Sequence, residues 1–277
     1  MVYRVEDLDS PRTKPGILEE ITDTLRWLGI DWDEGPLVQT ADLGPCVGAA
    51  RDLARAGLIY PCALTRREIA AAASAPQEGA GESVFPAALR PPIEPRSFSD
   101  TGTNWRFVVP DDEVRFVDTF AGPQRHRPGE QIGDFVVWTR RGEPSYQLAV
   151  TVDDHRQGVT RVVRGDDLLP SAARQILLRR ALGIERDPVY THLPLVLGPD
   201  GRRLAKRHGD TRLTHYRHGL GVPAERVIGL LARWCGVTER REPLSAAEFA
   251  VGLALARMPR DPVVCRPEDQ EWLCNGS

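Results

Sequence analysis

Lysine is almost absent from this 277-residue sequence: Lys14 and Lys206 are the only two among 36 basic residues, and the others are arginine. The 39 acidic residues bring the formal net charge to −3, which excludes a protein that binds nucleic acid by bulk charge alone. A local basic groove is compatible with this charge. Because a compact ammonium and a planar guanidinium differ in chemistry, the positions that keep a lysine are informative.

Three further features are missing, and each narrows the class of protein. No run of about 18 apolar residues occurs, so no transmembrane helix is expected. Residues 1–9 carry four charges and no apolar stretch, so they are not expected to be a signal peptide. The five cysteines are odd in number and have no metal-binding spacing, which favours reduced thiols in the cytoplasm over a disulfide framework.

Hydrophobic residues make up 41% of the chain, enough for a buried core, and their spacing predicts helices separated by strands. Helices are predicted over residues 17–28, 43–56 and 170–182, and again after residue 211. Strands are predicted at residues 3–8, 106–109, 114–120, 134–138, 146–152, 161–163 and 192–197. This alternation favours an α/β fold with a mostly parallel sheet that binds its ligand at the carboxyl ends of the strands.

Four stretches, in this order, resemble the catalytic core of the glutamate-specific class I aminoacyl-tRNA synthetases. They are RVEDLDSPR at residues 4–12, YQLAVTVDD at 146–154, RGDDLL at 164–169 and RLAKR at 203–207. The resemblance runs from Tyr3 to near Leu213 and is strongest to the short paralogous family, the glutamyl-Q tRNA(Asp) synthetases. Members of that family activate glutamate with ATP and transfer it to the queuosine base of tRNA(Asp).

The resemblance implies a Rossmann-like class I catalytic domain with an inserted α+β subdomain and a C-terminal helical segment. It also implies roles for individual residues. Glu6 would hold the α-ammonium of glutamate, the Tyr146 hydroxyl would face the amino acid, and Arg164 would bind a substrate carboxylate. Lys206 would be catalytic: in the family the lysine of this loop moves with the ATP phosphates and stabilises the charge that develops as pyrophosphate leaves. Arg203 would join Lys206 in binding ATP.

Each of these residues also has an ordinary alternative. Glu6 could be a surface carboxylate in an acidic turn, and Tyr146 could be a core tyrosine with a satisfied hydroxyl. Arg164 could form a salt bridge with Asp166 or Asp167. The catalytic lysine could belong to a plain basic surface loop. The residues alone leave these alternatives open.

The sequence departs from the family in one large respect. Family members begin with a strand, a Ser-Pro-Thr-Gly loop and a helix that opens with His-Ile-Gly-His. No His-x-Gly-His occurs here, so the first strand and helix of the fold are expected to be missing. A true start upstream would restore them, whereas a real truncation would give an inactive or partner-dependent protein. For the 277 residues alone, the resemblance predicts little or no adenylate-forming activity.

The second departure concerns metal. Many family members bind zinc in the insertion through Cys-x-Cys and Tyr-x-x-x-Cys; here Cys62 remains, but Leu64, Phe85 and Leu89 fill the other positions. None of these three binds zinc, so we expect a zinc-free insertion held by their packing. Mg²⁺ is expected only with ATP. The Asp-Asp-His at residues 153–155 is expected to be scaffold, because neighbours on a strand point to opposite faces.

The implied organisation has four segments. Residues 1–56 would be the remnant of the first half of the catalytic domain and 57–131 the inserted acceptor-binding-type subdomain. Residues 132–210 would be the second half with its lysine loop, and 211–277 a C-terminal helical segment. A cytoplasmic monomer acting on glutamate, ATP and tRNA(Asp), with no membrane partner, is expected. The alternatives are a core that charges tRNA(Glu), a catalytically impaired paralogue that only binds tRNA or a protein, and a generic α/β binding module.

Overall fold

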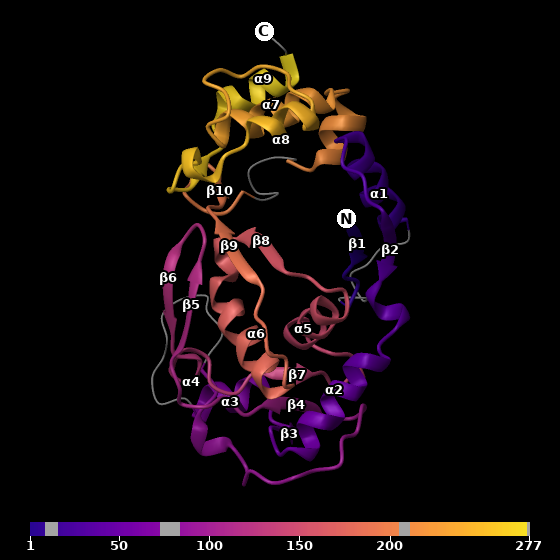
Figure 1. The fold of residues 1–277 in the computed structure, drawn as a ribbon, viewed down its shortest axis with the longest axis vertical. Coiled ribbons are helices and arrows are strands. Elements are labelled where there is room, and N and C mark those ends of the chain that lie inside the picture. The colour runs from indigo at the N-terminus through magenta and orange to yellow at the C-terminus, as the bar shows by residue number, and fades with distance from the viewer. Residues whose placement is uncertain (9–15, 73–83, 205–210, 276–277) are drawn as a thin grey trace. The chain divides into compact units, whose positions relative to one another are not determined.

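The computed structural model describes residues 1–8, 16–72, 84–204 and 211–275. The chain divides into two compact units, one of residues 38–192 and one that joins residues 1–37 to residues 193–277 (Figure 1). Within the described residues, none of the helices combines the length and apolar character that a membrane span requires.

The unit of residues 38–192 combines small sheets with packed helices. Its strands are β3 (Ile59–Cys62), β4 (Asn104–Phe107), β5 (Val114–Asp118), β6 (Gly122–His126), β7 (Val136–Trp138), β8 (Arg161–Gly165) and β9 (Val189–Leu193). Its α-helices are α2 (Gly44–Arg55), α3 (Arg66–Ala72), α4 (Pro128–Gln131), α5 (Tyr146–Arg156) and α6 (Leu169–Ala181). Helix α5 packs between α2 and α6, and it forms the core of this unit with them.

The pairing of the strands differs from the mostly parallel sheet that the alternation predicts. Strands β3, β4 and β7 form an antiparallel sheet, and β5 and β6 form an antiparallel hairpin. Only three residues connect β5 to β6, and so short a connection can join only antiparallel strands. Strands β8 and β9 also pair, and helix α6 connects them in the strand–helix–strand order of α/β folds.

The strand predicted at residues 146–152 is wrong, because these residues form the helix α5. Every side chain from Gln147 to Asp154 is buried, so the segment has no polar face that could reveal a helical period. A short apolar run buried on all sides reads the same way in a strand and in a helix. The argument that residues 153–155 point to opposite faces of a strand fails with it. The Asp153 carboxylate nevertheless has partners within the protein, because it accepts hydrogen bonds from Gln39 at 2.7 Å and from Arg156 at 3.3 Å.

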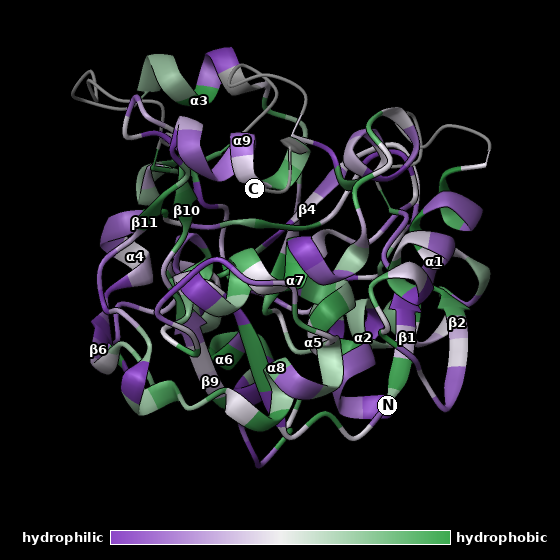
Figure 2. Ribbon diagram, turned by 90° about the horizontal axis from the view of Figure 1, so that it is seen from above, coloured by the Kyte–Doolittle hydropathy of each residue, from purple (hydrophilic) through white to green (hydrophobic). Residues whose placement is uncertain are grey.

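The second unit contains the two chain ends. Its elements are β1 (Val2–Val5), α1 (Ile17–Trp27), β2 (Glu34–Val38), β10 (Val196–Leu197), α7 (Ala224–Trp234), α8 (Ala246–Gly252), β11 (Val263–Val264) and α9 (Pro267–Asn275). Val227, Leu230 and Leu273 form a core between α7 and α9, and Trp27 at the end of α1 packs against it. Strand β10, green in Figure 2, pairs in parallel with β11.

The single strand predicted at residues 192–197 is interrupted. Strand β9 ends at Leu193, and β10 begins at Val196. Pro194 lies between them, and a proline has no N–H to give to a sheet. A tight turn follows β10, in which the N–H of Gly201 bonds to the carbonyl of Gly198 at 3.0 Å.

A buried carboxylate joins three parts of the inserted segment. The side chain of Asp134 has no exposed surface, and it accepts two hydrogen bonds from Arg90, at 2.6 and 2.8 Å. It also accepts from the Tyr60 hydroxyl at 2.7 Å and the Val109 N–H at 2.9 Å. Burial and the bond to Asp134 raise the pKa of Tyr60, so its hydroxyl keeps the proton that it donates. This network connects β3, the segment before β4, the segment that follows β4 and the residues that lead into β7.

Candidate active site

Arg164 lies in β8 and has no acidic partner among the described residues. Its Nε donates to His192 Nε2 at 3.0 Å, one terminal nitrogen lies 3.4 Å from the Leu168 carbonyl, and the guanidinium lies over the Tyr190 ring at 5.6 Å. The salt bridge to Asp166 or Asp167 considered above is not formed. An arginine held by neutral groups keeps its charge for an anionic ligand, which fits the predicted contact with a carboxylate.

A fully buried histidine–aspartate pair supports Arg164. His192 Nδ1 lies 2.7 Å from Asp118 Oδ2, and neither side chain has exposed surface. Burial acts to raise the pKa of Asp118, but hydrogen bonds from the Ala121 N–H, from His192 and from the Phe120 N–H outweigh it and hold the pKa below its ordinary value. The carboxylate is therefore charged at neutral pH. Burial also raises the pKa of the neighbouring Tyr190, whose hydroxyl stays neutral.

Tyr146 begins α5 and is 39% exposed, so it is not the core tyrosine of the alternative interpretation. The next residue, Gln147, donates to the Ser171 hydroxyl at 3.0 Å, which brings together the first turns of α5 and α6. Arg164 reaches Leu168, one residue before α6 begins. Tyr146 and Arg164, two residues predicted to contact glutamate, thus lie near the N-termini of α5 and α6, which pack together. The first N–H groups of a helix have no partner within the helix, so this end favours an anion.

Glu6 follows β1 in the unit that joins residues 1–37 to residues 193–277, whereas Tyr146 and Arg164 belong to the unit of residues 38–192. Its carboxylate pairs with Arg4, whose Nε and terminal nitrogen lie 3.3 and 2.9 Å from Oε1. Both bonds end on the same oxygen, and the Glu6 side chain is 39% exposed. The second oxygen can accept from an ammonium without breaking this pair.

Arg203 lies at the end of the turn that follows β10. It forms a β-bridge with Leu197, and the N–H of Leu204 bonds to the Val196 carbonyl at 2.9 Å. Strand β10 also pairs with β11. Arg203, the first residue of the predicted lysine loop, is therefore bonded to a strand that is itself held in a sheet. Lys206 itself, like Lys14, lies outside the described residues.

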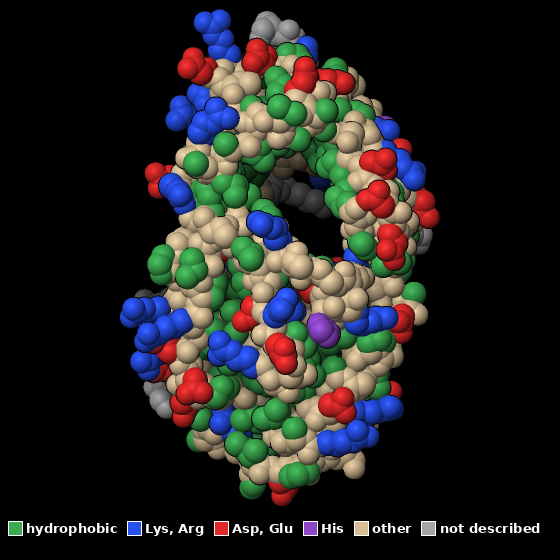
Figure 3. All heavy atoms as spheres, viewed as in Figure 1, with side chains coloured by type: hydrophobic (Ala, Val, Ile, Leu, Met, Phe, Trp, Pro, Cys, Tyr) green, Lys and Arg blue, Asp and Glu red, His purple; other side chains and the backbone are tan. Residues whose placement is uncertain are grey.

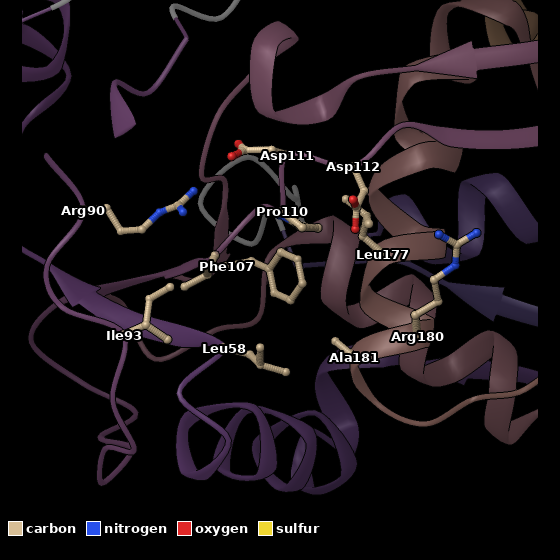
Figure 4. A pocket seen from close by; sticks show the side chains of 11 residues that line it. Leu58, Arg90, Ile93, Phe107, Pro110, Asp111, Asp112, Leu177, Arg180 and Ala181 are labelled. Carbon is tan, nitrogen blue, oxygen red and sulfur yellow. The ribbon is translucent and has the colours of Figure 1, made fainter. Parts of the chain in front are cut away.

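A pocket of about 430 Å³ in the unit of residues 38–192 is separate from these residues. Leu58, Phe107 and Leu177 line its apolar part, and Figure 4 shows the Phe107 ring in its middle with Arg90 and Arg180 on opposite sides. The Arg90 guanidinium is already bound to Asp134. The pocket contains none of the predicted site residues and has an apolar floor, so it does not resemble a site for a zwitterion or a phosphate.

The insertion packs as the sequence predicts at the position of the family's zinc site. Cys62 and Phe85 are buried in one cluster with Tyr60, and Leu64 and Leu89 pack against it. A zinc ion needs four ligands of nitrogen, sulfur or oxygen, and the three leucine and phenylalanine side chains offer none. The residues present do not fit the metal.

We therefore expect the purified protein to contain less than about 0.1 zinc per chain, because one remaining thiol cannot hold the ion. Elemental analysis of protein grown with added zinc measures this directly. One zinc per chain, retained after dialysis against a weak chelator, would show that another ligand set exists. A variant with Cys62→Ser is the matched control, since its zinc content is expected to equal that of the parent.

The sequence pattern did not single out His192 and Asp118 as site residues. They are 74 positions apart and share no motif, and the only signal was a histidine inside an apolar strand. A histidine there needs a buried partner, but the sequence does not say which residue provides it.

Comparisons with known proteins identify the family of this chain. Residues 1–269 match the family described as tRNA synthetases class I (E and Q), catalytic domain. The chain belongs to this family. It is therefore a ligase of the tRNA synthetase type, and the family uses an amino acid, ATP and a tRNA.

Two relatives and one solved structure give the detail. The chain is 44% identical to a glutamyl-Q tRNA(Asp) synthetase of Symbiobacterium thermophilum, over all of this chain and 88% of that protein. It is 38% identical to glutamate–tRNA ligase 1 of Dinoroseobacter shibae over 84% of this chain, but it spans only 49% of that enzyme. A glutamate tRNA ligase from Elizabethkingia meningosepticum has the same fold, with a TM-score of 0.79 at 23% identity over 98% of this chain and 61% of that one. This likeness confirms the predicted class I synthetase fold.

Proposed function

We propose that this protein activates glutamate with ATP and transfers it to the queuosine base of tRNA(Asp). The similarity along the whole chain to a glutamyl-Q tRNA(Asp) synthetase carries the proposal. The chemistry at Arg164 supports it, because this cation has no acidic partner among the described residues and suits an anionic amino acid. The protein would work in the cytoplasm as a monomer.

Five residues would perform the activation. Glu6 binds the α-ammonium of glutamate, Tyr146 faces the amino acid, and Arg164 binds the carboxylate of its side chain. Arg203 and Lys206 bind the phosphates of ATP, which brings Mg²⁺ with it. The substrate carboxylate is itself the nucleophile, so the protein contributes position and charge and needs no nucleophilic side chain.

The segment of residues 57–131 would contact the tRNA. In the β5–β6 hairpin Arg115 lies directly opposite Arg125, and like charges across a strand pair are unfavourable unless an anion offsets them. Glu113 neutralises Arg115, but Arg125 has no acidic partner in the described part of the chain. Basic side chains gather over this hairpin in Figure 3, and their charge fits an RNA backbone. Residues 132–210 would form the second half of the catalytic domain, with residues 1–56 belonging to its first half and residues 211–277 forming an accessory helical segment.

The acceptor is the point on which the two candidate activities differ. The protein, as expressed from its own chromosomal locus, is incubated with ATP, labelled glutamate and either queuosine-containing tRNA(Asp) or tRNA(Glu). Nuclease digestion then locates the label. We expect it on the anticodon fragment of tRNA(Asp), at least about tenfold above tRNA(Glu), a difference of about 1.4 kcal/mol in the barrier.

Label on the 3′-terminal adenosine of tRNA(Glu) would instead support the second candidate, a core that charges tRNA(Glu). The similarity to glutamate–tRNA ligase 1 favours this candidate, although it covers half of that enzyme. Unmodified tRNA(Asp) transcript is the control, since without queuosine it offers no acceptor base. Label on neither tRNA would contradict both activities.

A further inference from the structure

The guanidinium of Arg164 is held on one side only. Its Nε and one terminal nitrogen face His192 and the Leu168 carbonyl, and its plane rests over Tyr190. These contacts use the side of the guanidinium that includes Nε. Each terminal nitrogen also has an N–H that points away from this side, along the end of the guanidinium. These two parallel N–H groups are the ones that a carboxylate accepts together.

The protonation of His192 follows from this arrangement. An arginine has no acceptor, so the Nε of Arg164 must donate and His192 Nε2 must accept. A neutral imidazole then carries its hydrogen on Nδ1, which faces Asp118 Oδ2 at 2.7 Å. The hydrogen bonds run in one direction, from Arg164 through His192 to Asp118. Protonation of Nε2 would set two donors against each other and break the contact with Arg164.

Asp118 is fixed by the backbone around it. It accepts from the N–H of Phe120 at 2.9 Å, of Ala121 at 2.7 Å and of His192 at 3.0 Å. The Thr119 N–H also bonds to the Tyr190 carbonyl at 2.9 Å, and the hydroxyls of Thr119 and Thr191 meet at 2.5 Å. The tip of the β5–β6 hairpin is thereby bound to β9. An aspartate placed by so many bonds gives His192 one orientation.

We propose that His192 and Asp118 are positioning residues, which orient Arg164 so that its terminal nitrogens bind the substrate carboxylate end-on. The inference rests on the proposed function for the identity of the carboxylate. It adds that glutamate affinity depends on two buried residues that do not touch glutamate. The β5–β6 hairpin, which supplies Asp118, therefore contributes to amino-acid binding as well as to any tRNA contact.

Two substitutions of His192 separate its two hydrogen bonds. In His192→Asn the amide nitrogen takes the place of Nδ1 and still donates to Asp118, but nothing reaches Arg164. In His192→Gln the amide takes the place of Nε2, and its oxygen accepts from Arg164. His155→Asn, at an exposed position at the end of α5, is the matched control.

Glutamate affinity, measured by calorimetry on the full chain, gives the answer. We expect His192→Asn to raise the dissociation constant for glutamate about tenfold, while His192→Gln stays within about threefold of the parent and His155→Asn leaves it unchanged. The thermal midpoint of His192→Asn is expected to stay near that of the parent, since Asp118 keeps its partner. Equal glutamate affinity in His192→Asn and the parent would overturn the proposal.

Arg164→Lys distinguishes the possible failures. If it weakens glutamate binding while His192→Asn does not, the carboxylate site stands and the positioning role is wrong. If neither variant weakens binding, the proposed glutamate site at Arg164 is wrong, and the positioning role falls with it. Nitrogen-15 NMR of the parent tests the geometry without substrate or variant: we expect the Nδ1–H tautomer for His192, and the Nε2–H tautomer would contradict the proposal.

Discussion

Replacing Asp134 with alanine is expected to lower the free energy of unfolding by about 3–5 kcal/mol, a large part of the stability of an ordinary domain. The carboxylate is wholly buried and satisfies Arg90, the Tyr60 hydroxyl and the Val109 N–H. Its removal leaves the hydroxyl and the amide without an acceptor, and it leaves the Arg90 guanidinium with the Val109 carbonyl at 2.9 Å. Arg90 suffers most, because its bond to Asp134 is what raises its pKa against the effect of burial.

Urea unfolding followed by circular dichroism measures this loss. Asp112→Ala is the matched control, because this aspartate is exposed and its loss is expected to change stability by less than about 0.5 kcal/mol. Tyr60→Phe removes only one of the bonds and is expected to cost about 1–2 kcal/mol. If Asp134→Ala were as stable as Asp112→Ala, the insertion would not depend on this network.

The second large effect is expected at Arg164. Arg164→Lys keeps the positive charge but removes the paired N–H groups, and we expect the dissociation constant for glutamate to rise about 100-fold. A lysine has a single nitrogen, Nζ, and no planar fork. It cannot replace the bond from Arg164 Nε to His192 and at the same time bind a carboxylate with two parallel bonds. Calorimetry with glutamate measures the change in affinity.

Arg161→Lys provides the comparison, because Arg161 lies on the same strand, is exposed and has no predicted contact with substrate. Its affinity for glutamate is expected to match that of the parent. Aspartate, one methylene shorter, is a useful second ligand: the parent should discriminate against it, and Arg164→Lys should discriminate less. An Arg164→Lys protein that binds glutamate as tightly as Arg161→Lys would show that another group recognises the carboxylate.

The sequence predicted the elements whose burial is one-sided. Helices α1 and α2 each alternate apolar and polar residues along the chain, and the structure confirms both within a residue or two. Helix α6 is buried on most sides, but Pro170 at its start and Gly183 after its end mark its bounds in the sequence. Helix α5 was misread because it is buried on all sides and carries no such alternation. The antiparallel pairing of β3, β4 and β7 depends on contacts between distant segments, which local patterns do not contain.

The candidate site divides in the same way. Glu6, Tyr146, Arg164, Arg203 and Lys206 stand in short motifs, so the resemblance could name them, and their roles remain proposals. The support beneath Arg164 could not be predicted, because Asp118 and His192 are distant in sequence and meet only when the hairpin contacts β9. A motif identifies the residue that touches a ligand more readily than the residues that hold it in place.

Glutamyl-queuosine in tRNA(Asp) tests the central claim most directly. The gene for this protein is deleted in its own host, tRNA(Asp) is isolated, and its nucleosides are separated by mass spectrometry. We expect queuosine to remain and its glutamylated form to disappear, to return when the gene is restored, and to stay below about one-tenth of normal with the Arg164→Lys gene. Normal glutamyl-queuosine in the deletion strain, or a loss of charged tRNA(Glu) in its place, would contradict the proposed function.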